Sequence, residues 1–284
     1  MKELILSIVK IGLPLSVVVS MFAQGLSIVP GQLALLFRER PLLMLRSLVA
    51  VLVLVPLAAF VIILLLKPSH DVAIGLAILV ASPAAPMMLV KVPKKGGSLA
   101  YMASLHLSLA LLALLTVPAT LYLFSEALGF QVEVGVFAVA RVVGMTILLP
   151  VGFGILIRSF FSKAADTIGP ALAKVGGVAL LVLVLFVAAM TYGLLMKMDL
   201  WSFLVMAVVV AVSIVIGHWL GPRDPEEQTT LAIESAARHP GLAMTIAALN
   251  FSPQKALMVL IPYLVVFMVV TTIYLQWRKR RSAE

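Results

Sequence analysis

The residues best suited to chemistry lie close together in an otherwise apolar stretch near the C-terminal end of the chain. Glu234 is followed by Arg238 and His239, and Pro240 and Gly241 come directly after them. A carboxylate in an apolar interior is costly unless it is neutralised or paired. Glutamate and arginine four positions apart can meet on one face of a helix. We therefore expect Glu234 and Arg238 to pair, either as part of a functional site or as a purely structural contact.

Two histidines and a lysine extend this set. His106 lies inside a second apolar stretch, and His239 lies beside the Pro-Gly pair. An imidazole titrates in the physiological range and can relay protons, although a single histidine in a membrane is often only a hydrogen-bond partner between helices. Lys91 follows a third apolar stretch, where its side chain either extends to the interface beside Lys94 and Lys95 or turns inward toward the other charged groups.

The composition indicates that membrane helices position these residues. Of the 284 residues, 63% are hydrophobic and only 12% are charged, whereas soluble domains average about 45–50% apolar and about 25% charged residues. A spanning helix takes about 20 apolar residues, so nine spans fill the chain and leave no length for a separate catalytic or nucleic-acid-binding domain. The apolar runs cover residues 4–28, 42–66, 71–90, 98–124, 134–158, 169–196, 200–220, 228–250 and 256–276.

The basic residues between these runs set the predicted orientation. Fourteen lysines and arginines lie in the breaks after the first, third, fifth and seventh runs and in the C-terminal tail, against four on the opposite side. Basic loops stay in the cytoplasm, so the sequence predicts a protein of the cell (inner) membrane with its N-terminus outside and its C-terminus in the cytoplasm. The net charge of +9 then reflects orientation, and no nucleic-acid partner is expected. The chain has no cysteine, and neither a metal site nor a cofactor is expected.

Two of the runs are predicted to break halfway across the membrane. Prolines interrupt the runs at 71–90 and 228–250, in each case twelve residues into the helix, which is about 18 Å at 1.5 Å per residue and close to the bilayer midplane. Internal proline removes a helical hydrogen bond, and paired broken helices are typical of transporter binding sites, where half-helix N-termini face the substrate. Ordinary proline kinks are the alternative. The predicted substrate-binding residues are Pro83, Ala84, Ala85, Pro86, His239, Pro240 and Gly241.

The motifs at these breaks resemble those of the bile acid:sodium symporter family. The stretch GLAILVASPAA at 75–85 resembles the family's Gly-Leu…Cys-Pro-Gly-Gly signature, and TLAIESAARHPGLA at 230–243 resembles its Thr-Ile-Glu…Gln-Asn-Ser-Gly-Leu-Ala motif. Gly-Leu-Ser at 25–27 and Leu-Leu-Pro at 148–150 lie where the family has similar residues. The order and spacing of the four stretches carry the resemblance, which covers nearly the whole chain. The count of nine spans resembles the nine-helix variant of the family.

The resemblance implies a fold and a mechanism. Residues 1–284 would form a single all-α transmembrane unit of nine helices, built from inverted repeats with two broken, crossing helices. Runs 4–28, 134–158 and 169–196 would form a panel domain, and the other six runs a core domain. A small organic anion would bind between the two domains and be carried by alternating access.

The departures from the family concern sodium. Its sodium sites use side-chain oxygens, and a sodium ion needs several such hard ligands. These departures imply a secondary transporter that is independent of sodium. It would be either a uniporter or a transporter coupled to protons through Glu234, His106 or His239. Lys91 is a further candidate for charge compensation. A transport-inactive binding or sensing protein is the alternative, and an enzyme is not expected. The family's oxygen ligands fall on Met88, Leu89, Met102, His106, Arg238 and a position near Val51, while its glutamate is kept as Glu234.

Overall fold

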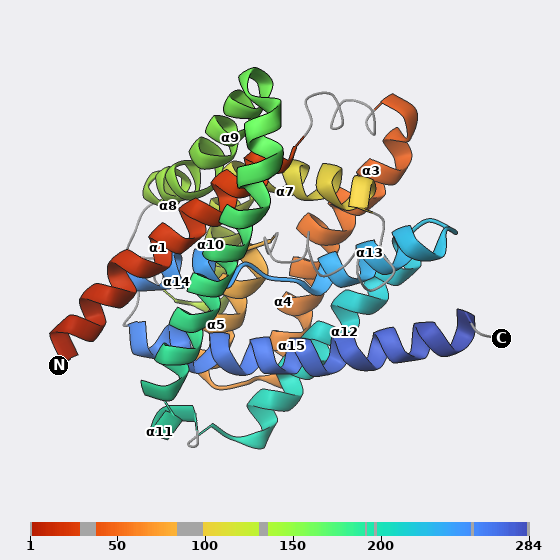
Figure 1. Ribbon diagram of the computed structural model, residues 1–284. Helices are drawn as coiled ribbons and strands as arrows, with labels where there is room; N and C mark the ends of the chain where they lie inside the picture. The colour runs from red at the N-terminus through yellow and green to blue at the C-terminus, as the bar shows by residue number, and fades with distance from the viewer. Residues whose placement is uncertain are drawn as a thin grey trace.

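The computed structural model is helical throughout the residues that it describes, which are 2–28, 38–83, 99–130, 136–190, 192–195, 198–250 and 253–282 (Figure 1). The N-terminal half contains α1 (Lys2–Ser27), α3 (Pro41–Val49), η1 (Ala50–Leu54), α4 (Val55–Leu66), α5 (His70–Ala81) and α7 (Leu99–Leu128). The C-terminal half contains α8 (Val136–Val143), η3 (Gly144–Leu148), α9 (Leu149–Phe160), α10 (Ser162–Met190), α11 (Tyr192–Leu195), α12 (Leu200–Leu220), α13 (Pro225–Ala236), α14 (Pro240–Asn250) and α15 (Pro253–Ser282).

Six helical segments in the described part are long and apolar enough to cross a membrane. They agree with six of the nine predicted runs, and the chain is a multi-pass membrane protein. Of the other three runs, 4–28 contributes a shorter apolar helix at Pro14–Ser27 and 71–90 contributes one at His70–Ala81. The run at 228–250 is divided between α13 and α14. The count of nine crossings stays a prediction.

Two of the spans that continue through an internal proline widen into a π-helical turn just before it. The π-helical turns η1 and η3 come directly before the Val55-Pro56 and Leu149-Pro150 pairs. Proline lacks an N–H group and its ring clashes with the carbonyl of the preceding turn, and a wider π turn relieves that clash while keeping the chain helical. The α3–η1–α4 and α8–η3–α9 segments therefore each run as one continuous span.

Helix α1 packs tightly against α9 and α10, although it is far from both in sequence (Figure 1). Glycines allow the closest approach: a Cβ atom on Gly25 of α1 would lie 2.9 Å from the Gly154 Cα atom of α9, too near for any side chain. The Arg158 Nη1 atom donates a hydrogen bond to the Leu26 carbonyl over 2.6 Å at the end of the same contact. These three helices correspond to the runs predicted for the panel domain.

The remaining helices surround the two interrupted segments. In Figure 1, α14 lies to the left of α5, and the long helix α15 runs across the lower half of the view; α15 packs against both α5 and α14. α13 packs on α12 and α7, and α12 packs on α4. The segment from Val72 to Ala81 is almost entirely buried, as expected for a helix enclosed by other helices. This arrangement places the ends of α5, α13 and α14 in the interior.

Candidate functional site

The two interrupted segments meet at their breaks. α5 ends two residues before Pro83, and Arg238 and His239 lie in the gap between α13 and α14. Pro83 and Arg238 form an isolated antiparallel bridge, and the His239 backbone N–H donates to the Ser82 carbonyl over 2.9 Å. The predicted loss of helical structure is confirmed at Ser82 and Pro83 and at Arg238 and His239, and so is the proximity of the two places. Pro240 and Gly241 already belong to α14, and residues 84–86 lie outside the described part of the chain. Backbone groups freed from the helices thus find partners in each other.

Arg238 binds the C-terminal ends of both interrupted helices. Its side chain is 2% exposed; Nη1 donates to the Val80 carbonyl of α5 over 3.3 Å, and Nη2 donates to the Ser235 carbonyl of α13. The Tyr263 hydroxyl of α15 donates to the Ala236 carbonyl over 3.1 Å. The last carbonyls of a helix lack partners within it and carry partial negative charge. One guanidinium therefore donates hydrogen bonds to the C-terminal ends of two helices.

Glu234 pairs with His106 of α7 and not with Arg238. The His106 Nδ1 and Glu234 Oε1 atoms are 2.9 Å apart, and both side chains are 0% exposed. The predicted Glu234–Arg238 pair is wrong because α13 ends at Ala236, which takes Arg238 out of the helical register that an i, i+4 contact requires. The guanidinium still interacts electrostatically with Glu234. Two predicted coupling residues, His106 and Glu234, are thus brought into direct contact.

His239 caps the N-terminus of α14. Its Nδ1 atom accepts a hydrogen bond from the Leu242 N–H over 3.1 Å, and its carbonyl accepts from the Ala243 N–H over 3.0 Å. An accepting Nδ1 carries no proton, so the ring is neutral with its proton on Nε2. Pro240 has no N–H group. In the first turn of α14, the Gly241 N–H is therefore the donor left without a partner among the described residues.

Helices α1 and α10 cover this end of α14. A Cβ atom on Gly241 would overlap the Val17 Cγ2 atom of α1 and would lie 3.5 Å from the Leu180 Cδ1 atom of α10. Val17 and Leu180 are themselves buried. The N-terminus at which an anion was predicted to bind is thus closed by apolar side chains in this structure.

Several sequence predictions are not tested at this site. The predicted site residues Ala84, Ala85, Pro86 and Lys91 and the ligand positions Met88 and Leu89 lie outside the described residues. Met102 and Val51 are described and are fully buried in apolar clusters. Within the part of the chain that the structure describes, no cluster of three histidines or carboxylates could hold a metal ion.

A comparison with known families agrees with the motif at the end of α5. The family described as the sodium bile acid symporter family matches residues 14–198. The chain belongs to this family. Its members are membrane transporters rather than enzymes. No curated protein matches the chain as a relative. The matched region covers well over half of the chain and includes the end of α5, whereas the break between α13 and α14 lies beyond it.

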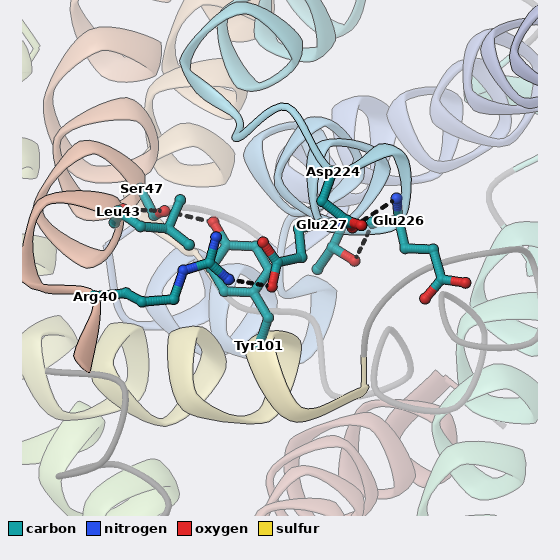
Figure 2. Close-up of polar contacts among 8 residues, drawn as sticks. Arg40, Leu43, Ser47, Tyr101, Asp224, Glu226 and Glu227 are labelled. Carbon is teal, nitrogen blue, oxygen red and sulfur yellow. Dashed lines mark hydrogen bonds and ion pairs between the residues drawn. The ribbon is translucent and has the colours of Figure 1, made fainter. Parts of the chain in front are cut away.

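In this family member, polar contacts hold the N-terminal end of α13 in place (Figure 2). The Arg40 Nη1 and Glu227 Oε1 atoms are 2.5 Å apart, and the Asp224 side chain caps α13 by accepting from the Glu226 and Glu227 N–H groups. The Tyr101 hydroxyl is 2.5 Å from the Ser47 Oγ atom. The Arg40–Glu227 pair ties α13 to the start of α3, and the Ser47–Tyr101 contact ties α3 to α7. Both the helix that carries Glu234 and the helix that carries His106 are thus attached to α3.

Proposed function

We propose that this member of the sodium bile acid symporter family is a secondary transporter of a small organic anion that works without sodium. The observation that carries the proposal is the buried Arg238 guanidinium at the C-terminal ends of α5 and α13. Half-helix C-terminal ends and unwound carbonyls are where broken-helix transporters hold a sodium ion. A fixed guanidinium repels a second cation at this place and supplies a positive charge permanently.

The loss of sodium ligands supports the same proposal. By resemblance, Met102 and Val51 stand where the family presents oxygens, and both side chains are fully buried among apolar neighbours. Thioether and alkyl groups do not bind a hard cation such as sodium. Glu234, which the family uses as a sodium ligand, already has His106 as its partner.

The substrate in this proposal is an anion because the unused groups of Arg238 and Gly241, on either side of Pro240, are hydrogen-bond donors. The Arg238 Nε atom has no hydrogen-bond partner among the described residues, and the Gly241 N–H lies at the positive end of the α14 dipole. A carboxylate or sulfonate accepts from both kinds of donor. We place the anion beside Pro83, His239, Pro240 and Gly241.

Alternating access in this proposal opens the contact that now covers α14. Helices α1, α8–α9 and α10 act as the panel domain and the other spans act as the core domain. Val17 of α1 and Leu180 of α10 lie against Gly241, so the panel must separate from α14 before an anion reaches the site. The protein is proposed to lie in the cell membrane with its C-terminus in the cytoplasm.

The test uses three monovalent organic anions: taurocholate, benzoate and pyruvate. Each is screened by thermal shift on the purified protein, and uptake into proteoliposomes is then measured in matched sodium and potassium buffers. We expect at least one anion to stabilise the protein and to be taken up equally in both buffers, and Arg238→Gln to weaken both effects. An absolute sodium requirement contradicts the proposal. Binding without any flux supports the transport-inactive binding protein instead.

A further inference from the structure

The place where the ends of α5, α13 and α14 meet is called the crossing below. Some buried polar atoms there have no hydrogen-bond partner among the described residues. His106 and Glu234 are 0% exposed and joined through one atom each, while the second atoms, His106 Nε2 and Glu234 Oε2, have no hydrogen-bond partner in the described part of the chain. Buried polar atoms are nearly always satisfied. Exceptions point to a bound species, and the smallest species that fits an imidazole and a carboxylate is a proton.

The charges of the described residues at the crossing can be counted. An arginine side chain stays protonated in proteins, so Arg238 contributes one positive charge. His239 is neutral because its Nδ1 atom accepts the Leu242 N–H. When Glu234 is a carboxylate and His106 is a neutral imidazole, the carboxylate balances the guanidinium and the crossing is neutral. When the His106–Glu234 pair takes one more proton, whether on Nε2 or on Oε2, the crossing carries one positive charge.

Net charge buried in a low-dielectric interior is strongly disfavoured. This cost decides in which loading states α1 and α10 can close over the site. With the proton bound, the positive crossing is neutralised by one monovalent anion. Without the proton, the crossing is neutral when it is empty. The two half-loaded states, proton without anion and anion without proton, each leave one unbalanced charge under α1 and α10. Only the fully loaded and fully empty states can then close.

We propose that the His106–Glu234 pair is the proton-binding site of the transporter, which makes it an electroneutral symporter of one proton with one monovalent organic anion. The inference rests on the proposed function and adds the coupling ion, the stoichiometry and the charge of the substrate. The proton enters on one side of the membrane at His106 Nε2 or Glu234 Oε2 and leaves from the same atom on the other side.

The other described ionisable groups near the His106–Glu234 pair are either bound to other residues or not buried. The pair is therefore the group that exchanges the proton in this proposal. Tyr101 of α7 interacts with Glu234 but its hydroxyl is bound to Ser47, and Tyr263 of α15 is bound to Ala236. His218 of α12 contacts Tyr274. The other described ionisable residues that pack against α7 or α13 from neighbouring segments are not buried: Arg40, Arg46, His70, Asp71, Arg141, Asp199, Arg278.

Glu234→Gln separates this role from a merely structural one. The substitution keeps the shape of the side chain and an oxygen for the His106 N–H, and it leaves the crossing permanently positive through Arg238. The loaded state stays neutral without a proton, so anion exchange continues. The empty state carries a charge and cannot return, so net transport stops. A structural role predicts instead that exchange and net transport fail together.

The experiment measures taurocholate, benzoate and pyruvate binding by calorimetry in buffers of different ionisation enthalpy, which reports protons taken up per anion bound. Taurocholate is most informative because its sulfonate stays charged throughout the pH range. Proteoliposomes then report exchange and net uptake separately. We expect about one proton per anion for the wild type, none for Glu234→Gln, and recovered proton uptake for Glu234→Asp. Glu126→Gln makes the same chemical change at an exposed position of α7 and serves as the control.

Each outcome decides a different claim. Wild-type binding without proton uptake, or net uptake that moves charge across the membrane, overturns proton symport and leaves the sodium-independent transporter standing. Loss of exchange together with net transport in Glu234→Gln, at unchanged thermal stability, also overturns it. If none of the three anions binds, the proposed function itself is contradicted.

Discussion

Gly241→Ala is expected to loosen the contact between α14 and its cover of α1 and α10. The added methyl group would overlap the Val17 Cγ2 atom and would lie 3.5 Å from the Leu180 Cδ1 atom. Overpacking of a tight apolar contact costs about 1–3 kcal/mol. Since about 1.4 kcal/mol changes an equilibrium tenfold, the closed arrangement should lose roughly 5- to 150-fold in population relative to arrangements in which α14 has separated from α1.

Cysteine labelling measures this change, because the chain contains no cysteine of its own. Leu180→Cys places a thiol at the buried contact, and its rate of reaction with a small maleimide should rise by up to the same factor when Gly241→Ala is added. Gly152→Ala is the matched control, since a Cβ atom there meets nothing within 4 Å. An unchanged rate for Gly241→Ala, or an equal rise for Gly152→Ala, refutes the reasoning that this contact closes the site.

Three further predictions concern charge and topology. Arg238→Gln should weaken anion binding by roughly 30-fold or more, because losing one partner of a buried charge pair costs about 2–5 kcal/mol, and it should create no sodium dependence; thermal-shift titrations in sodium and potassium buffers check both. Glu227→Gln should change the melting temperature little, since a partly exposed ion pair with Arg40 contributes about 0–1 kcal/mol. Reporter fusions should all report the cytoplasm, and an external C-terminus would overturn the predicted orientation. The fusion points are Ser98, Lys163 and Glu284.

The helical layout and the breaks could be predicted because their causes are local. Apolar length marks each span, and proline removes a hydrogen bond wherever it stands inside a helix. Local rules do not distinguish all prolines, however. Pro56 and Pro150 follow π turns within continuous spans, whereas Pro83 and Pro240 stand at real interruptions. The difference lies in the tertiary partners that the freed backbone groups find, and a single sequence does not encode those partners by spacing.

The pairing of Glu234 could not be read from spacing for the same reason. His106 is 128 positions away in the chain, and Arg238 is nearby in sequence but beyond the end of the helix. One signal was available: a carboxylate and an imidazole in separate apolar runs both need a buried partner, and each is the natural partner of the other. No comparable sequence signal pointed to the contact of Arg238 with the carbonyls of two helices. The same is true of the hydrogen bond from Tyr263 to the Ala236 carbonyl.

We propose that Arg238 supplies the positive charge that a sodium ion supplies in sodium-coupled transporters. The anion site is then organised without a bound ion. The most direct measurement is the initial uptake rate of whichever of taurocholate, benzoate and pyruvate gives the largest thermal shift, in sodium and in potassium buffers of equal pH and ionic strength. We expect equal rates in the two buffers. A rate that is higher in sodium by about tenfold, equivalent to about 1.4 kcal/mol of coupling, would contradict this proposal.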